Sequence, residues 1–131
     1  MTQRMGHRSM PVLQVTDIDQ SVAFFKDKLG FSTASIWDHE GQKVFAIVGM
    51  DMITLALQVH GPVGTGDVWA CYCYVDDIDA YADDVRRRGG DIVWGPEDAP
   101  YGCREIEVID PDGNRICFGQ DLSPGDLGPG L

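Results

Sequence analysis

A five-residue segment that occurs twice constrains this chain more than any other feature. Residues Val75 to Asp79 (VDDID) repeat the pattern of Val15 to Asp19 (VTDID), with an offset of 60 positions that also relates Gly30 to Gly90. Each copy follows an apolar stretch of strand character and begins a helix-like stretch that stops at glycine. Two copies are too few for a solenoid, which needs at least three stacked repeats. We therefore expect a pseudo-twofold domain with a functional site where its halves meet.

The net charge of the chain limits its partners. With 21 acidic and 10 basic residues, the formal net charge is −11. Nucleic acids and anionic membrane surfaces select clusters of Lys and Arg, so we expect neither as a partner. An acidic surface would favour a cationic small molecule, although solubility alone explains such a charge more simply.

Signals for export or membrane insertion are missing from the sequence. No apolar run reaches the ~18 residues that a membrane-spanning helix needs. Residues 1–8 carry basic side chains without the apolar region of a secretory signal, so we expect a cytoplasmic protein. Cys71, Cys73, Cys103 and Cys117 show neither a CxxC pair nor the spacing of a disulfide framework. We expect reduced, largely buried thiols.

The length of 131 residues fits one domain with a substantial core. Within it we expect an N-terminal arm at 1–8, a single domain at 9–120 built from two modules (9–59 and 68–120, with a Gly/Pro-rich linker at 60–67), and a flexible tail at 121–131. Each module is expected to run strand, helix, strand, strand, strand, which is an α+β fold. Asp17 and Asp77 are predicted to cap the two helices. The strands are predicted at 9–16, 31–37, 43–48, 52–59, 68–75, 91–94, 103–109 and 115–120, with a loop at 95–102.

Alternation along the strands separates two faces, because successive side chains of a strand point to opposite sides. One face is small or apolar and is expected to pack against the helices. The other face is mixed, which is typical of a groove that holds a ligand, whereas a solvent-exposed face usually carries more Lys and Glu. We interpret the mixed face as a groove. Its polar and aromatic members are Gln14, Thr54, Gln58, Tyr72, Tyr74, Arg115 and Cys117.

The register of the last hairpin extends this face to the seventh strand. If Val108 pairs with Ile116, then Glu107 lies beside Cys117 and Glu105 lies two residues further along the same face. Both carboxylates would then line the groove, or would sit on an exposed edge; the sequence leaves the two readings open. A carboxylate beside Cys117 would raise the pKa of its thiol, which argues against a nucleophilic role.

Several motifs resemble one family. The first helix (residues 21–31), Arg104-Glu105, the D-P-D-G-N turn at 110–114 and Phe118-Gly119-Gln120 are similar to those of the glyoxalase/bleomycin resistance protein/dioxygenase group, also called the vicinal oxygen chelate superfamily. The resemblance covers residues 9–120. It implies two βαβββ modules that form a curved mixed sheet around a groove.

The resemblance also locates the positions at which metal-dependent members of the family hold their ion. Those members use His or Glu, whereas this sequence has Met10, Ala56, Ala70 and Cys117 at the corresponding positions. Thioether and methyl side chains are poor ligands for a hard divalent ion. We therefore expect no metal and no other cofactor.

Metal-free members that resemble bleomycin-resistance proteins sequester drugs, usually as homodimers whose grooves draw on both chains. The resemblance thus implies antibiotic-like small-molecule binding, with an aromatic and cationic ligand. Parity along the fifth strand places Trp69 on the core face, and Trp94 is expected to be structural. The alternatives are an enzyme of the same superfamily (lyase, isomerase or dioxygenase), with an atypical metal site or none, and a pure interaction domain. The expected ligand-binding residues are Gln14, Trp37, Thr54, Gln58, Tyr72, Tyr74, Glu107, Arg115 and Cys117.

Overall fold

The computed structural model describes residues 3–125 and contains the two predicted βαβββ modules. The elements of the first module are β1 (Val12–Gln14), α1 (Ile18–Asp27), β2 (Ser32–His39), β3 (Gln42–Met50) and β4 (Ile53–Gln58). Those of the second are β5 (Trp69–Tyr74), α2 (Ile78–Arg87), β6 (Trp94–Asp98), β7 (Cys103–Ile109) and β8 (Arg115–Asp121). Within the described part of the chain, no helix is long and apolar enough to span a membrane.

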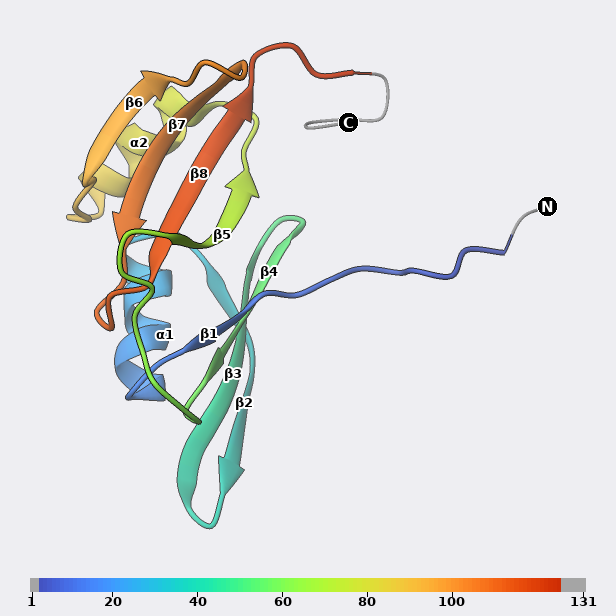
Figure 1. Cartoon of the computed structure of the whole chain (residues 1–131). Helices are drawn as coiled ribbons and strands as arrows, with labels where there is room; N and C mark the ends of the chain where they lie inside the picture. Colours follow the sequence, from blue (N-terminus) through green and yellow to red (C-terminus); the bar gives the residue numbers. More distant parts are fainter. Residues whose placement is uncertain (1–2, 126–131) are drawn as a thin grey trace.

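Each module builds its own four-stranded mixed sheet. The strand orders are β1-β4-β3-β2 and β5-β8-β7-β6, with the first pair of each sheet parallel and the others antiparallel. α1 packs against the first sheet and α2 against the second, so both helices lie on one side of the molecule. The other side, on the right of Figure 1, carries no helix of residues 3–125 and is called the helix-free face below. The α+β fold predicted from the sequence is confirmed.

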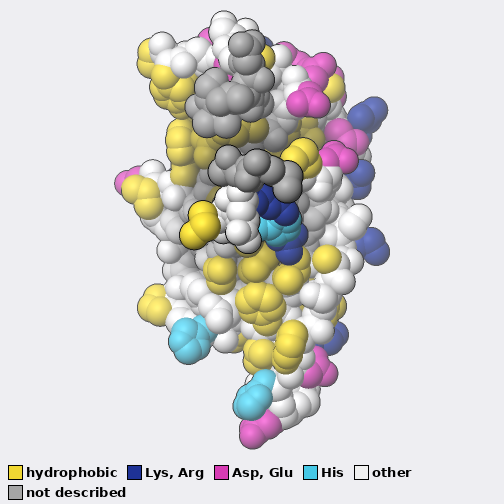
Figure 2. Space-filling view, turned by 90° about the vertical axis from the view of Figure 1, so that its right-hand side faces the viewer, with side chains coloured by type: hydrophobic (Ala, Val, Ile, Leu, Met, Phe, Trp, Pro, Cys, Tyr) yellow, Lys and Arg dark blue, Asp and Glu magenta, His cyan; other side chains and the backbone are white. Residues whose placement is uncertain are grey.

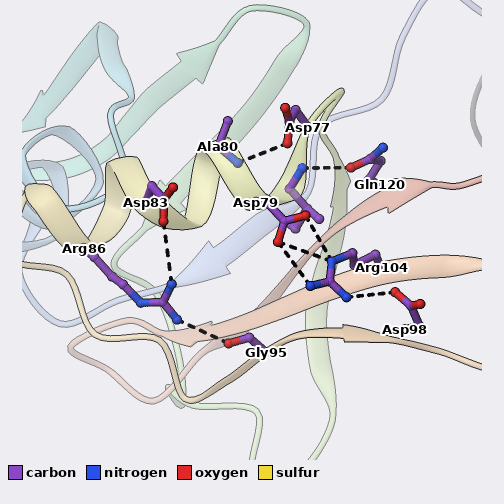
Figure 3. Close-up of polar contacts among 10 residues, drawn as sticks. Asp77, Asp79, Ala80, Asp83, Arg86, Gly95, Asp98, Arg104 and Gln120 are labelled. Carbon is purple, nitrogen blue, oxygen red and sulfur yellow. Dashed lines mark hydrogen bonds and ion pairs between the residues drawn. The ribbon is translucent and has the colours of Figure 1, made fainter.

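The duplicated segment has the same structural task in both modules. Asp17 and Asp77 cap α1 and α2 by accepting hydrogen bonds from the backbone N–H of Gln20 (2.9 Å) and Ala80 (3.1 Å). Two residues on, Asp19 pairs with Lys43 (2.7 Å). Its counterpart Asp79 pairs with Arg104, which also reaches Asp98 at 3.0 Å (Figure 3). The repeat therefore joins each helix to its sheet, and it is a structural motif.

The D-P-D-G-N turn between β7 and β8 joins the two modules. Asp110, which is buried, accepts from the backbone N–H of Asp112 and Asn114 and from the side-chain amide of Asn114. The same amide donates to the backbone carbonyl of Gln14 at 2.9 Å, so the turn of the second module holds β1 of the first. Desolvation raises the pKa of Asp110, and these hydrogen bonds oppose the shift.

Replacement of Asn114 by alanine is expected to lower the free energy of unfolding by about 2 kcal/mol, because it leaves the buried Asp110 carboxylate and the Gln14 carbonyl each short of a partner. Denaturant unfolding measures the change. Asp112→Ala, which removes the two exposed hydrogen bonds that its carboxylate accepts from the backbone N–H (3.2 Å) and the hydroxyl (2.7 Å) of Thr16, is the matched control and is expected to change stability by less than about 1 kcal/mol. Equal effects of the two changes would contradict this role for Asn114.

One aromatic core spans the module boundary. Phe31 of the first module lies edge-on to Phe118 of the second, with ring centroids 6.4 Å apart. Tyr81 of α2 packs on Phe118 at 4.9 Å and donates its hydroxyl to the Leu29 carbonyl at 2.7 Å. Burial raises the pKa of Tyr81. The two halves therefore share one core, which fixes how their sheets are placed.

Two strands differ most from the sequence prediction, and the bounds of the others agree with it to within two residues. The first strand is only Val12–Gln14, and the sixth is Trp94–Asp98 instead of 91–94. The residues predicted as a loop at 95–102 therefore begin with a strand, because Pro96 needs no hydrogen-bond partner on the outer edge of the sheet and a register shift between Trp94 and Glu97 accommodates it. Residues 1–2 of the predicted arm and 126–131 of the predicted tail lie outside the described residues.

Candidate functional site

Three aromatic side chains form a row along β5 on the helix-free face. The ring centroids of Trp69 and Tyr72 are 5.5 Å apart, and those of Tyr72 and Tyr74 are 4.9 Å apart. Trp69 and Tyr74 are each about two-fifths exposed, at 42% and 41%. The parity prediction for Trp69 is wrong, since a register shift between Trp69 and Cys71 pairs Trp69 with Arg115 and turns the indole to the helix-free face.

A glycine of the neighbouring strand makes room for the middle ring of this row. Tyr72 lies over Gly119 of β8 so closely that a Cβ on that glycine would be 1.8 Å from the tyrosine Oη. The Tyr72 hydroxyl is buried and has no hydrogen-bond partner among the described residues. Burial raises the pKa of Tyr72, and the nearby Cys103 and Glu105 raise it further. The ring is thus held firmly while its polar atom stays unsatisfied.

Glu107 on β7 is anchored within the same face. Its carboxylate accepts from the indole N–H of Trp69 at 3.0 Å and from Arg115 at 2.8 Å. The predicted register is confirmed, with Glu107 opposite Cys117 and Glu105 opposite Gly119. Both carboxylates are buried (4% and 2% exposed), because β6 forms the edge outside β7, so the exposed-edge reading is wrong.

Cys117 is fully buried at the centre of the second sheet. Burial raises the pKa of its thiol, and the charges of Glu105 and Glu107 raise it further. The thiol is therefore a poor nucleophile at neutral pH, as the sequence indicated. All four cysteines are free thiols, and Cys73 lies in the core with Cys71 packed against it.

Two adjoining hollows lie between the modules and share Met52, Ile53 and Tyr74. The first, with a volume of about 310 Å³, is lined by Ser9, Pro11, Met52, the start of β4 (Ile53 to Leu55) and Tyr72 to Tyr74. The second, of about 590 Å³, is lined by Met50 to Ile53, Tyr74 to Asp77, Ala80 and Tyr81. Figure 2, which views the helix-free face, shows hydrophobic side chains gathered there, with acidic side chains towards the margins. The volumes of the two hollows suit an organic ligand of moderate size.

The structure brings some of the predicted ligand residues together and separates others. Thr54, Tyr72 and Tyr74 line the smaller hollow. Gln14 and Gln58 lie on the first sheet and are hydrogen-bonded to each other at 2.9 Å. Trp37 is 69% exposed on β2, outside both hollows. The other three predicted residues lie on β7 and β8: Glu107 pairs with Arg115 and accepts from Trp69, and the buried Cys117 lies opposite Glu107.

The residues at the family's usual metal positions do not fit a divalent ion. Ala56 and Cys117 are fully buried, Ala70 packs on the core, and Met10 precedes the short β1. Methyl and thioether groups supply no oxygen or imidazole donor, and one buried thiol with a raised pKa does not compensate. No cluster of three or more His, Cys, Asp or Glu suited to a metal occurs among residues 3–125.

The sequence prediction missed two side chains of the site, Trp69 and Tyr101. Trp69 was placed on the wrong side, since a bulge cannot be read from the alternation of residues. Tyr101, in the turn between β6 and β7, donates its hydroxyl to Glu105. Burial raises the pKa of Tyr101, and the bond to Glu105 contributes. Its position in a predicted loop gave no signal of this contact.

Comparisons with known proteins agree on the family. The model of the Glyoxalase/Bleomycin resistance protein/Dioxygenase superfamily matches residues 5–118. An uncharacterized protein of Mycolicibacterium smegmatis is 32% identical over 115 residues, covering 83% of this chain and 89% of that protein.

Two solved structures share the fold. The chain is similar to TnmS3, an antibiotic binding protein from Streptomyces sp. CB03234, with a TM-score of 0.69 and 23% identity over 90% of this chain and 99% of that one. It is also similar to a bleomycin-binding protein complexed with bleomycin, with a TM-score of 0.71 and 21% identity over 88% and 98% of the two chains.

Proposed function

The chain belongs to the Glyoxalase/Bleomycin resistance protein/Dioxygenase superfamily, and we propose that within it this protein is a metal-free binder that sequesters an aromatic, antibiotic-like small molecule. The observation that carries the proposal is the aromatic row of Trp69, Tyr72 and Tyr74 beside the two hollows. Flat rings can stack on such a row, and offset-stacked or edge-to-face contacts between aromatic rings are favourable beyond the area that they bury.

Charge supports a cationic ligand. The lining of the larger hollow includes Asp51, Asp76 and Asp77, and within the described chain no Lys or Arg lines either hollow. With a formal net charge of −11, the protein would attract a cation and orient it towards this region. Two relatives of the same fold bind antibiotics by name, which agrees with such a ligand.

An enzyme of the same superfamily remains the alternative. The donor set at the usual metal positions offers no hard ligands, and the buried Cys117 is a poor nucleophile, so binding without chemistry is the better-supported function. A thermal-shift screen of glycopeptide and polycyclic antibiotics would find the ligand. Elemental analysis of the purified protein would test the alternative, which a tightly bound stoichiometric divalent ion would favour.

Binding is expected to quench tryptophan fluorescence, and Trp69 is expected to be the reporter. Trp69 packs against Tyr72, which lines the smaller hollow, with ring centroids 5.5 Å apart. Trp37 lies on β2, outside both hollows. Titration of Trp69→Phe with a ligand from the screen should therefore lose most of the quenching, and Trp37→Phe should keep it. Loss of quenching in Trp37→Phe alone would place the ligand elsewhere.

We also propose a homodimer located in the cytoplasm. All of β2 is exposed, including Ile36 (42%) and Trp37 (69%), and its outer edge is unpaired within the described chain. A second copy packed there would cover the exposed apolar side chains Ile36 and Trp37 of this edge strand. Analytical ultracentrifugation would measure the assembly, and a monomer at micromolar concentration would count against it.

A further inference from the structure

The two buried carboxylates of β7, Glu105 and Glu107, differ in how far neighbouring groups compensate their charge. Glu107 accepts from Arg115 and from the indole of Trp69, so its charge is neutralised inside the protein. Glu105 is 2% exposed, and no Lys, Arg or His pairs with it in the described part of the chain. A buried carboxylate is usually paired, because an unbalanced charge in a low-dielectric interior is unfavourable.

The surroundings of Glu105 increase this imbalance. Its cross-strand neighbour on β6 is Glu97, a second carboxylate. Like charges directly opposite each other in a sheet are destabilising. The side-chain hydroxyl of Tyr72 lies over Gly119, which pairs with Glu105 across β7 and β8, and it forms no hydrogen bond among residues 3–125. Glu105 and Tyr72 therefore leave both a charge and a hydroxyl without full compensation.

Among the described residues, Tyr101 is the one side chain that forms a hydrogen bond with Glu105, and it is well suited to being displaced. Its hydroxyl donates to Glu105 Oε2 from the turn between β6 and β7, while 59% of the residue is exposed to solvent. A side chain so exposed has little packing to lose when it moves. The Tyr101 hydroxyl thus occupies a position that a cationic group could take with a stronger, charge-assisted bond.

We propose that Glu105 is a cation-binding subsite of the ligand groove, which Tyr101 fills in the free protein and which a protonated amine or amidine of the ligand takes over. The subsite rests on the proposed ligand-binding function. In the bound state Tyr101 turns out to solvent, the ligand cation pairs with Glu105, and the Tyr72 hydroxyl accepts a further N–H from it. Tyr72 links this subsite to the smaller hollow, where its ring is part of the lining.

The test uses two flat probes that differ in charge: proflavine, which is cationic at neutral pH, and acridone, which is neutral. Dissociation constants for both are measured by fluorescence with the wild-type protein and three variants. Glu105→Gln should weaken proflavine binding at least tenfold and leave acridone binding within twofold. Tyr101→Phe, which removes the competing hydroxyl and keeps the ring, should tighten proflavine binding about threefold or more and leave acridone unchanged. Glu40→Gln removes the same charge from an exposed turn that lines neither hollow and should have little effect on either probe.

The possible results distinguish failure of the proposed subsite from failure of the proposed ligand-binding function. Equal weakening of both probes by Glu105→Gln would make Glu105 a structural residue and overturn the subsite, while ligand binding would stand. Weaker or unchanged proflavine binding by Tyr101→Phe would also overturn it, and this variant needs no change in the core. Failure of the wild-type protein to bind either probe would count against the proposed function and the subsite together.

Discussion

Replacement of Arg115 by methionine is expected to lower the free energy of unfolding by about 3 kcal/mol. Arg115 is the only cation that pairs with Glu107 among the described residues, and the Glu107 side chain is 5% exposed. Removal of one partner from a buried ion pair leaves an uncompensated charge, which typically destabilises by about 3–5 kcal/mol. The lower end applies because the Arg115 side chain retains 24% exposure. Chemical denaturation at neutral pH measures the effect.

A second substitution tests whether the uncompensated charge is the cause. In Glu107→Gln/Arg115→Met, the neutral amide oxygen still accepts from the Trp69 indole, and no charge is left buried. The double variant should recover more than half of the lost stability. If it is as unstable as Arg115→Met alone, the arginine acts through its contact with the Gly66 carbonyl instead of through Glu107.

Replacement of Gly119 by alanine is expected to weaken ligand binding by roughly 30-fold, which corresponds to about 2 kcal/mol. The new methyl group would lie 1.8 Å from Tyr72 Oη and 2.5 Å from Cζ, so the ring must leave its place. Tyr72 then no longer lines the smaller hollow or packs against the rings of Trp69 and Tyr74. Calorimetric titration of proflavine into the variant measures the loss.

A double-mutant cycle tests whether Gly119→Ala weakens binding by displacing Tyr72. Tyr72→Ala should weaken binding by a similar factor, and Gly119→Ala added to it should weaken binding no further, because the methyl group then has room. Additive losses in the double variant would show that Gly119 acts on the groove independently of Tyr72. Circular dichroism of each variant controls for folding.

The sequence predicted the modules, both helices and the pairing of the last hairpin because these depend on local chemistry. Asp17 and Asp77 cap helices through bonds three residues away. The alternation of Glu105 to Val108 against Ile116 to Gly119 allowed one register that buries the apolar side chains. Such signals lie within a few residues of where they act.

The site was predicted less completely because it depends on irregularities and on long-range contacts. A bulge in β5 moved Trp69 to the helix-free face, and alternation of residues carries no mark of a bulge. The contact of Tyr101 with Glu105 comes from a tight turn that folds a loop residue back over the sheet. Gln14 and Gln58 were assigned to the correct face, but their mutual hydrogen bond, which spans the parallel pair β1 and β4, follows from tertiary packing.

The central claim is that the groove holds its ligand without a metal and without chemical change. Equilibrium dialysis of chelator-treated protein against a ligand from the thermal-shift screen, followed by mass spectrometry of the recovered ligand, tests it most directly. We predict saturable binding whose affinity is unaffected by added Mg²⁺, Zn²⁺ or Fe²⁺, with the ligand recovered intact. Recovery of a converted product, or binding that appears only after a divalent ion is restored, would contradict the account.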